Sequence, residues 1–320
     1  MGNSWSEQVV SITVLIYNAL KRKIGVYLYG EWTQGPPGLT NTEIEEFESQ
    51  FESLATPWKR RYGHRLDPIV HDRFKLVFPG AENESTDLET IVKPRNKPDV
   101  DPPIIPFDQL GLNCNTVNAV AFLVQWFMFS ETEGPYIPSR LFLYYAARSS
   151  TEFDYQMRMV DQGVSFSDVF SVINLCVPVP DELEWMYNVK HVNTKPTSGK
   201  DPLDIPFVAV QLNPALLNLV TCLKTNGPFT AAVSVTKEFE LNAKYTYDAN
   251  DLVEGYQPLV FIDFSEDKQT FTAVNSFGNN WGDHGKVTLH VADLFKDPVF
   301  TSSIYTLVPV QTDSDEEKSD

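Results

Sequence analysis

Asn275-Ser-Phe-Gly-Asn-Asn-Trp-Gly-Asp-His-Gly285 is the stretch of the sequence that says most about the fold. It follows two apolar runs, 259–264 and 270–274, which are separated by a charged turn at 265–269. Two apolar runs around a polar turn predict a β-hairpin, and a further strand is expected over 286–291. Three glycines within eleven residues predict a backbone that passes close to another part of the molecule. An ordinary glycine-rich loop between strands is the simpler explanation of the same letters.

The form of this stretch, Asn-Ser-aromatic-Gly-x-x-Trp-Gly-x-x-Gly, resembles the asparagine loop of papain-like cysteine peptidases. That family also carries Asp-Gln-Gly-x-x-Gly-Ser-Cys before its central helix. This chain reads Asp108-Gln-Leu-Gly-Leu-Asn-Cys114, followed by a strongly apolar helix expected over 115–129. Further matches to the family's helices, turns and first β strand are found at 138–148, 161–175, 176–187 and 216–235. The resemblance implies an α+β fold of two lobes, one helical and one an antiparallel barrel-like sheet, over residues 101–310.

The resemblance also implies a candidate site in the groove between the two lobes. Cys114 matches the nucleophile, Asn275 the amide that orients the catalytic histidine, and Gln109 the glutamine of the oxyanion hole. A cysteine at a helix N-terminus lies where the helix dipole favours a thiolate. Trp281 would shield the orienting hydrogen bond from water, and Asn113 stands where the family usually has Ser. The spacing from Gln109 to Cys114 is one residue short of the family's spacing.

The catalytic histidine of the family is missing from its expected place. It should begin the strand before the hairpin, and an alignment of the hairpin without gaps places Gln257 there, followed by Pro258. Glutamine cannot act as a general base, because its amide does not protonate near neutral pH. Loss of a triad member usually removes several orders of magnitude in rate. We therefore expect an inactive papain-like protein that serves as a structural or binding component and keeps a vestigial site at Cys114, Gln257, Asn275 and Gln109.

An active cysteine peptidase or transferase is the alternative, because Cys114 and Asn275 are both present. Such an enzyme would need an unusual general base. His64 or His71 could reach the groove from the N-terminal region, and His284 lies within the glycine-rich loop. Each of these histidines is more often a surface or core residue than a catalyst. Cys114 and Asn275 can also be present for packing alone, since a buried cysteine behaves as a small apolar side chain.

The first hundred residues are expected to form a separate module, or an arm that packs on the papain-like region. Met1-Gly-Asn-Ser-Trp-Ser6 fits the N-myristoylation pattern, with Gly2 as the acceptor. The basic run 21–23 could supply the second signal for membrane attachment, although a solvated helix end explains it equally well. This N-terminal region could also fill the groove as a pro-segment would. An acylated, inactivated protease-like protein would suit a virion component of a large DNA virus or its host interface.

The overall composition limits the partners and the compartment. Lys and Arg total 25 against 43 Asp and Glu in 320 residues, a net charge of −18 that argues against nucleic acid as the main partner. Three widely spaced cysteines are not a disulfide framework, so an intracellular compartment is expected. We find no metal-ligand set and no phosphate-binding loop, and therefore expect no cofactor. The acidic tail 311–320 is expected to be disordered. A protein or peptide held in the interlobe groove is the expected partner.

Overall fold

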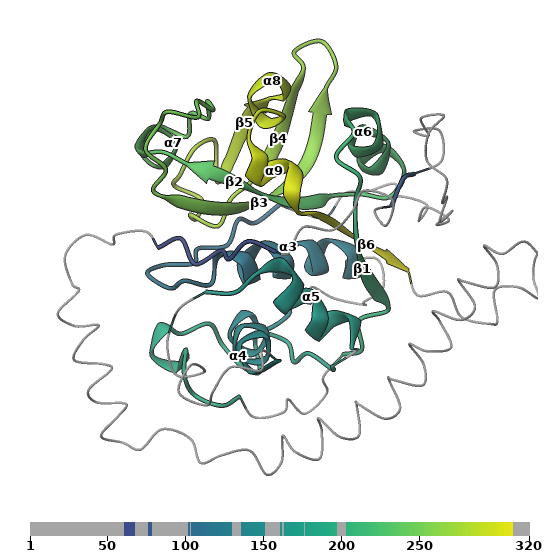
Figure 1. Cartoon of the computed structure of the whole chain (residues 1–320). Coiled ribbons are helices and arrows are strands. Elements are labelled where there is room, and N and C mark those ends of the chain that lie inside the picture. Colours follow the sequence, from purple (N-terminus) through teal and green to yellow (C-terminus); the bar gives the residue numbers. More distant parts are fainter. Residues whose placement is uncertain are drawn as a thin grey trace, which may run out of the picture.

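The computed structural model describes residues 61–67, 76–78, 102, 104–129, 136–150, 161, 163–175, 177–196 and 203–309 (Figure 1). Several predictions on the sequence fall outside these ranges: the acylation pattern at Gly2, the basic run 21–23, His71, Cys176 and the acidic tail. The described residues form two lobes, with helices in the lower lobe of Figure 1 and a sheet with shorter helices in the upper one. This is the α+β architecture that the sequence predicts.

The helical lobe is built around one buried helix. Helix α3, Asn115–Met128, has every side chain buried except the partly buried Gln125, as expected of a helix that is apolar on all sides. Around it lie α4 (Arg140–Ser150), α5 (Phe166–Asn174) and a short 3₁₀ helix (Val189–His191). The side chains of Ser165 and Asp168 form a capping box that fixes the start of α5. The lobe thus surrounds α3 and leaves its first turn facing the sheet.

The other lobe is an antiparallel sheet of six strands in the described part of the chain, in the order β1-β6-β2-β3-β4-β5. A core rich in aromatic rings supports it from inside, with Phe229 and Phe261 stacked at 4.9 Å and Phe271 edge-on to both. The strands and the remaining helices are β1 (Phe207–Gln211), α6 (Leu216–Thr225), β2 (Phe229–Val235), α7 (Lys237–Asn242), β3 (Gly255–Ser265), β4 (Thr270–Val274), β5 (Lys286–His290), α8 (Val291–Leu294), α9 (Pro298–Ser302) and β6 (Ile304–Pro309).

The predicted hairpin is confirmed, but its first strand is longer than expected. The apolar run predicts a strand from 259, whereas β3 begins at Gly255. Strand β2 pairs with β3 along this extension, and Gln257 lies opposite Val233. Gln257 is therefore held within a regular strand, at the end of the sheet that faces α3.

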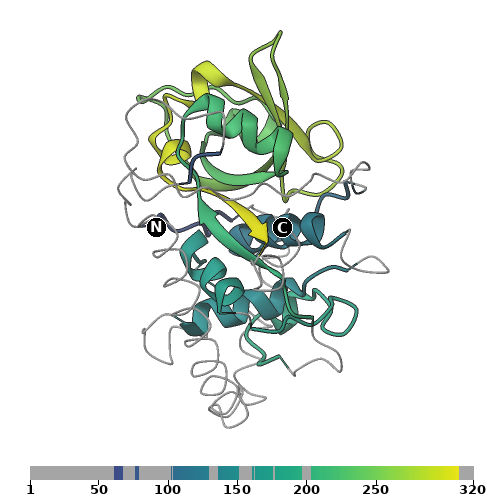
Figure 2. The ribbon, with the colours of Figure 1, turned by 90° about the vertical axis from the view of Figure 1, so that its right-hand side faces the viewer.

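The two lobes are joined by backbone as well as by side chains. The N–H of Gln109 donates to the carbonyl oxygen of Ser276 (2.9 Å), and the N–H of Gly278 donates to that of Phe107 (3.0 Å). Strands β1 and β6 also extend from the sheet towards the helices, and β1 packs on α5 (Figure 2). The loop before α3 and the loop after β4 are consequently fixed relative to each other.

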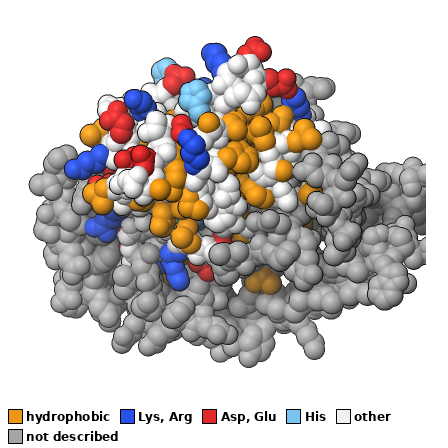
Figure 3. Space-filling view, turned by 45° about the horizontal axis from the view of Figure 1, so that its top comes forward, with side chains coloured by type: hydrophobic (Ala, Val, Ile, Leu, Met, Phe, Trp, Pro, Cys, Tyr) orange, Lys and Arg blue, Asp and Glu red, His pale blue; other side chains and the backbone are white. Residues whose placement is uncertain are grey.

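The surface of the sheet lobe mixes side-chain types. Apolar side chains gather in patches between acidic and basic ones on the face in Figure 3. Large apolar side chains of this lobe that are exposed are Leu217, Leu241, Leu252 and Val253. Single exposed apolar residues are normal on protein surfaces, so we assign them no role.

One buried carboxylate ties the helices of the sheet lobe to its strands. Asp297 is fully buried, and its oxygens accept from the N–H and the hydroxyl of Ser234 (2.7 and 3.0 Å), from the Tyr245 hydroxyl (2.7 Å) and from the N–H of Val299 (2.9 Å). These bonds connect the start of α9 to β2 and to the loop after α7. Without the carboxylate, several buried donors would lose their acceptor.

We predict that Asp297→Ala lowers the free energy of unfolding by about 3 kcal/mol, since it leaves buried donors unpaired. Urea unfolding followed by circular dichroism measures this. Asp251→Ala, at an exposed position, is the matched control and should change stability by less than about 0.5 kcal/mol. Equal effects of the two substitutions would show that the Asp297 network carries no stability.

Candidate functional site

Three amide side chains from the two lobes form a hydrogen-bonded row at the first turn of α3. Asn115 Nδ2 donates to Gln257 Oε1 (3.0 Å), and Gln257 Nε2 donates to Asn275 Oδ1 (2.7 Å). The hydroxyl of Ser276 accepts from Gln257 Nε2 (3.0 Å) and donates to Gln109 Oε1 (2.8 Å). All five residues are buried. The structure therefore brings together Gln109, Gln257 and Asn275, as the sequence predicts, and adds Asn115, which the sequence analysis missed.

Asn115, and not Cys114, has the spacing from Gln109 that the papain-like motif gives its cysteine. In the papain-like motif the cysteine is the sixth residue after the glutamine. The sixth residue after Gln109 is Asn115. In this register Leu110 takes the place of the motif's first glycine. Leu110 adopts φ +54°, in the left-handed region that favours glycine, which supports the register. The spacing of the motif favours Asn115, whereas the residue type favours Cys114, and the sequence analysis followed the residue type.

Cys114 has its own hydrogen-bond partners, away from the amide row. Its Sγ lies 2.9 Å from the Tyr187 hydroxyl and accepts from Asn118 Nδ2 (3.2 Å). The helix N-terminus was expected to favour a thiolate, but burial has the larger effect and raises the pKa of the thiol to about 12. The structure thus places Cys114 as a protonated, fully buried side chain, and does not bring its thiol into hydrogen-bonding contact with Gln257 or Asn275.

Asn113 and Trp281 fix the loops on either side of the row. The N–H of Asn113 donates to the Asp161 carboxylate (3.0 and 3.1 Å), and its side-chain amide donates to the Asp161 carbonyl oxygen. Trp281 donates from its ring N–H to the carbonyl oxygen of Glu240 (2.8 Å) and packs edge-on against Phe277. Both residues support the groove, and their observed partners are Asp161 and Glu240.

Residues 61–67 run between the two lobes, next to the first turn of α3 (the longer of the two purple segments in Figure 1). Gln109 Nε2 donates to the carbonyl oxygen of Arg61 (2.8 Å), so the glutamine expected in an oxyanion hole binds a peptide carbonyl of the same chain. On the helical side, His64 forms a parallel bridge with Val164, whose carbonyl oxygen accepts from the N–H of Arg65 (3.2 Å). On the sheet side, the Tyr62 hydroxyl donates to Glu240 (2.6 Å). The groove is filled by this segment of its own chain.

A second N-terminal segment is held on the sheet lobe. The N–H of Leu76 donates to the carbonyl oxygen of Gln211 (2.8 Å), and the N–H of Phe78 donates to the side chain of Asn218 (2.7 Å). The side chains of Leu76 and Phe78 are buried in the sheet-lobe core. The N-terminal region therefore packs on the later part of the chain at two separate places.

His64 does reach the groove, but it does not lie in a position to act as a base for Cys114. Its Nδ1 lies 3.0 Å from the Thr116 hydroxyl, which itself donates to the Val164 carbonyl oxygen (2.8 Å). Nδ1 must therefore carry the hydrogen, and Nε2 is a buried acceptor without a partner. Burial lowers the pKa of His64 to about 3, so the ring is neutral at physiological pH. Of the other histidines considered from the sequence, His284 is exposed on the glycine-rich loop and His71 lies outside the described residues.

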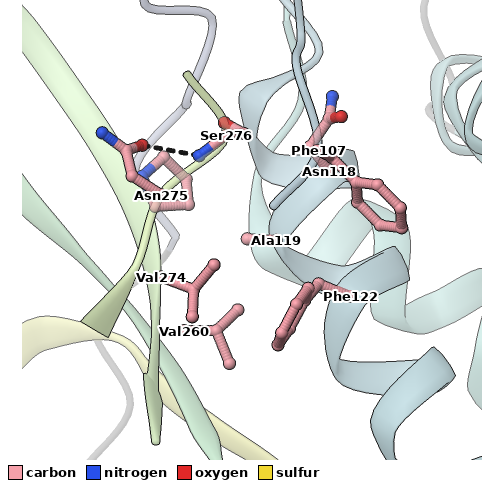
Figure 4. A pocket seen from close by; sticks show the side chains of 9 residues that line it. Phe107, Asn118, Ala119, Phe122, Val260, Val274, Asn275 and Ser276 are labelled. Carbon is pink, nitrogen blue, oxygen red and sulfur yellow. Dashed lines mark hydrogen bonds between the residues drawn. The ribbon is translucent and has the colours of Figure 1, made fainter. Parts of the chain in front are cut away.

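The space behind the amide row is closely packed. Ala119 and Phe122 of α3 face Val260 and Val274 of the sheet across a cavity of about 10 Å³ (Figure 4). A cavity of this size holds at most one water molecule. The space behind the row therefore leaves no room for a ligand larger than a water molecule.

The described residues provide no other obvious site. They contain no group of three or more His, Cys, Asp or Glu side chains that could hold a metal ion. None of the helices in the described part of the chain is long and apolar enough to cross a membrane.

Comparison with known proteins identifies the fold. No protein-family model matches the sequence, and no curated protein matches it either. Among solved structures, xylellain, a cysteine protease from Xylella fastidiosa, is similar over 80% of this chain and 100% of its own, with 23% identity and a TM-score of 0.58. ProCathepsin B S9 from Trypanosoma congolense covers 87% of this chain and 100% of its own, with 12% identity and a TM-score of 0.52.

A third similar structure is the proform of Amb a 11, a cysteine protease and ragweed pollen allergen. It covers 68% of each chain with 15% identity and a TM-score of 0.51. The chain therefore has a papain-like α+β fold, as the sequence resemblance implied. Identities this low establish the fold and leave the chemistry to the residues of the site.

The burial of neutral His64 makes the docking of residues 61–67 dependent on pH. The pKa is about 3 in the docked state against an ordinary value of 6.5, so protons bind preferentially to the undocked state. Docking is then unaffected above pH 6.5, and weakens about tenfold for each pH unit between 6.5 and 3. At pH 5 we predict a loss of about 30-fold in the docking equilibrium.

Hydrogen exchange of the Arg65 amide, expressed as a protection factor at pH 7.5, 6 and 5, measures this change. His64→Gln is the control, because glutamine does not titrate in this range. An equal loss of protection in both proteins would assign the effect to other groups.

Proposed function

We propose that this protein is a papain-like binding protein without peptidase activity, whose interlobe groove holds extended peptide segments. The observation that carries the proposal is the amide row: Asn115 stands at the nucleophile's position and Gln257 at that of the general base. Neither side chain can perform covalent acyl transfer, since an amide is neither a nucleophile nor a base near neutral pH.

The geometry of the row supports a site without catalytic groups that keeps the hydrogen-bonded order of a papain-type site. A papain-type site needs a nucleophile, a base that contacts it, and an amide that orients the base. Here Asn115, Gln257 and Asn275 follow one another in that order, at hydrogen bonds of 3.0 and 2.7 Å. An amide fills each position, and the two hydrogen bonds join the lobes without an ionisable group in the row, while Asn275 Nδ2 is left buried without a partner.

The contacts of residues 61–67 support peptide binding as the function of a groove that has no catalytic groups. Gln109 still binds a peptide carbonyl, that of Arg61, and the bridge at Val164 holds extended backbone. The alternative, an active enzyme that uses Cys114, would require this buried thiol with a pKa of about 12 to leave Tyr187 and to recruit a base. His64, which contacts Thr116 in the first turn of α3, is itself neutral and buried.

A peptidase assay tests this proposal. We expect purified wild-type protein and its Cys114→Ala variant to leave a mixed peptide library uncut at both pH 7.5 and pH 5. Gln257→His should also be silent, because restoring the base leaves Asn115 in the nucleophile's place. The Asn115→Cys/Gln257→His double variant restores both groups and is the positive comparison. Cleavage by the wild type that disappears in Cys114→Ala would refute the proposal and establish Cys114 as a nucleophile.

We further propose that N-myristoylation at Gly2 attaches this binding protein to membranes, in a virion or at its host interface. The supporting observations are the Met1–Ser6 pattern and the basic run 21–23. Expression in eukaryotic cells with an alkyne analogue of myristate should label the wild type and shift it to the membrane fraction. Gly2→Ala should lose both the label and the shift. A wild type that stays unlabelled would rule out this attachment while leaving the groove proposal intact.

A further inference from the structure

We propose that the groove selects partner segments with the order tyrosine–glycine–histidine, lying parallel to residues 163–165 as residues 61–67 do. This inference rests on the binding function proposed above and specifies its ligand. The segment of the chain that is already seated in the groove serves as the template. Positions 62, 63 and 64 each contact a different part of the groove, and each part limits which side chain can fit.

The central position accepts only glycine. A Cβ atom on Gly63 would overlap the carbonyl oxygen and the Cβ of Asn113. Gly163 adopts φ +79°, and a Cβ atom there would overlap the carbonyl oxygen of Gly63. Asn113 and Gly163 are both held by the loop around Asp161, and neither wall is a flexible side-chain end. The groove is thus narrowed to the width of a bare backbone at this point.

The preceding position favours tyrosine. The Tyr62 ring lies edge-on to Phe277 with its centroid at 6.3 Å, and its hydroxyl donates to Glu240 (2.6 Å). Beneath it, a Cβ on Gly255 would overlap the Cβ of Tyr62, so the start of β3 is also kept bare for the passing chain. A phenylalanine would keep the ring contact but leave Glu240 without this donor.

The following position favours histidine in its neutral form. The imidazole ring packs on Phe166 with centroids at 4.8 Å, and Nδ1–H donates to the Thr116 hydroxyl. The position is buried, so a cationic or larger polar side chain would lose hydration without gaining a charged partner. Thr116 in turn donates to Val164, which ties this pocket to the bridge that aligns the segment.

The direction of the ligand is set at both ends of the motif. Gln109 binds the carbonyl oxygen of Arg61 before the glycine, and the Val164 carbonyl oxygen binds the N–H of Arg65 after it. Beyond these, the N–H of Ser167 donates to the carboxylate of Asp67 (2.9 Å). A segment of reversed order would present its carbonyl and N–H groups at the wrong places.

The test uses full-length protein and three labelled heptapeptides. One has the sequence of residues 61–67, the second replaces its glycine with alanine, and the third has the reversed order. The wild-type chain should bind all three weakly, because its own segment fills the groove. In Gly63→Ala the chain's own segment cannot pass the narrow point, so the groove is open. This variant should bind the first peptide at least about tenfold more tightly than the other two, by fluorescence anisotropy at pH 7.5.

Tyr62→Ala, which removes a side-chain anchor and keeps the backbone, is a second way to free the groove if Gly63→Ala does not fold. Equal binding of the three peptides by the opened variants, or no binding up to about 1 mM, would overturn the inference. The peptides are recovered afterwards, and their masses are measured by mass spectrometry to detect cleavage. Cleavage would refute the proposed non-catalytic function instead, so the two failures are distinguishable.

Discussion

The hydrogen bonds that Gln257 makes to Asn115 and Asn275 are the constraint on which the groove depends. They bridge the first turn of α3, the start of β3 and the loop after β4 in one buried line. A cysteine–histidine pair in the same place would carry opposite charges in a poorly solvated site, and such charges are costly unless they are fully compensated. Neutral amides have both donors and acceptors, so they can satisfy one another without that cost. In the function proposed above, the row keeps the connection between the lobes without groups that perform acyl transfer.

The neighbouring segment, residues 61–67, does contain ionisable side chains. Arg61 faces Asp161 at 3.7 Å, and His64 carries an unpaired buried nitrogen. A buried polar atom without a partner weakens the state in which it is buried. In the row itself, Asn275 Nδ2 is likewise buried without a partner, so both the row and the segment contain an unsatisfied polar atom. They differ in charge, because the row has no ionisable side chain whereas the segment contains Arg61 and His64. A change of pH therefore acts on the segment and not on the row.

Much of the fold could be predicted from local patterns, because each lobe is built from long apolar runs and the asparagine loop has a distinctive form. Gln257 could be expected next to Asn275 because no gap intervenes between it and the hairpin, and the two side chains are hydrogen-bonded. Asn115 was missed because one residue at the start of a helix turns a side chain by about 100°. That rotation directs Cys114 to Tyr187 and Asn118 and directs Asn115 to Gln257. The path of residues 61–67 has no periodicity, and its contacts lie more than 45 positions away in the sequence, so it could not be read locally.

The anchor at Leu76–Phe78 has a consequence for any exchange in the groove. These residues keep their own hydrogen bonds to Gln211 and Asn218, which do not involve the groove. A partner that displaces residues 61–67 therefore leaves them tethered through the short connection 68–75. A tethered competitor has an effective concentration in the millimolar range and rebinds whenever the partner dissociates. In the binding function proposed above, a partner segment must therefore outcompete residues 61–67, so the chain's own segment sets a lower limit on the partner's affinity.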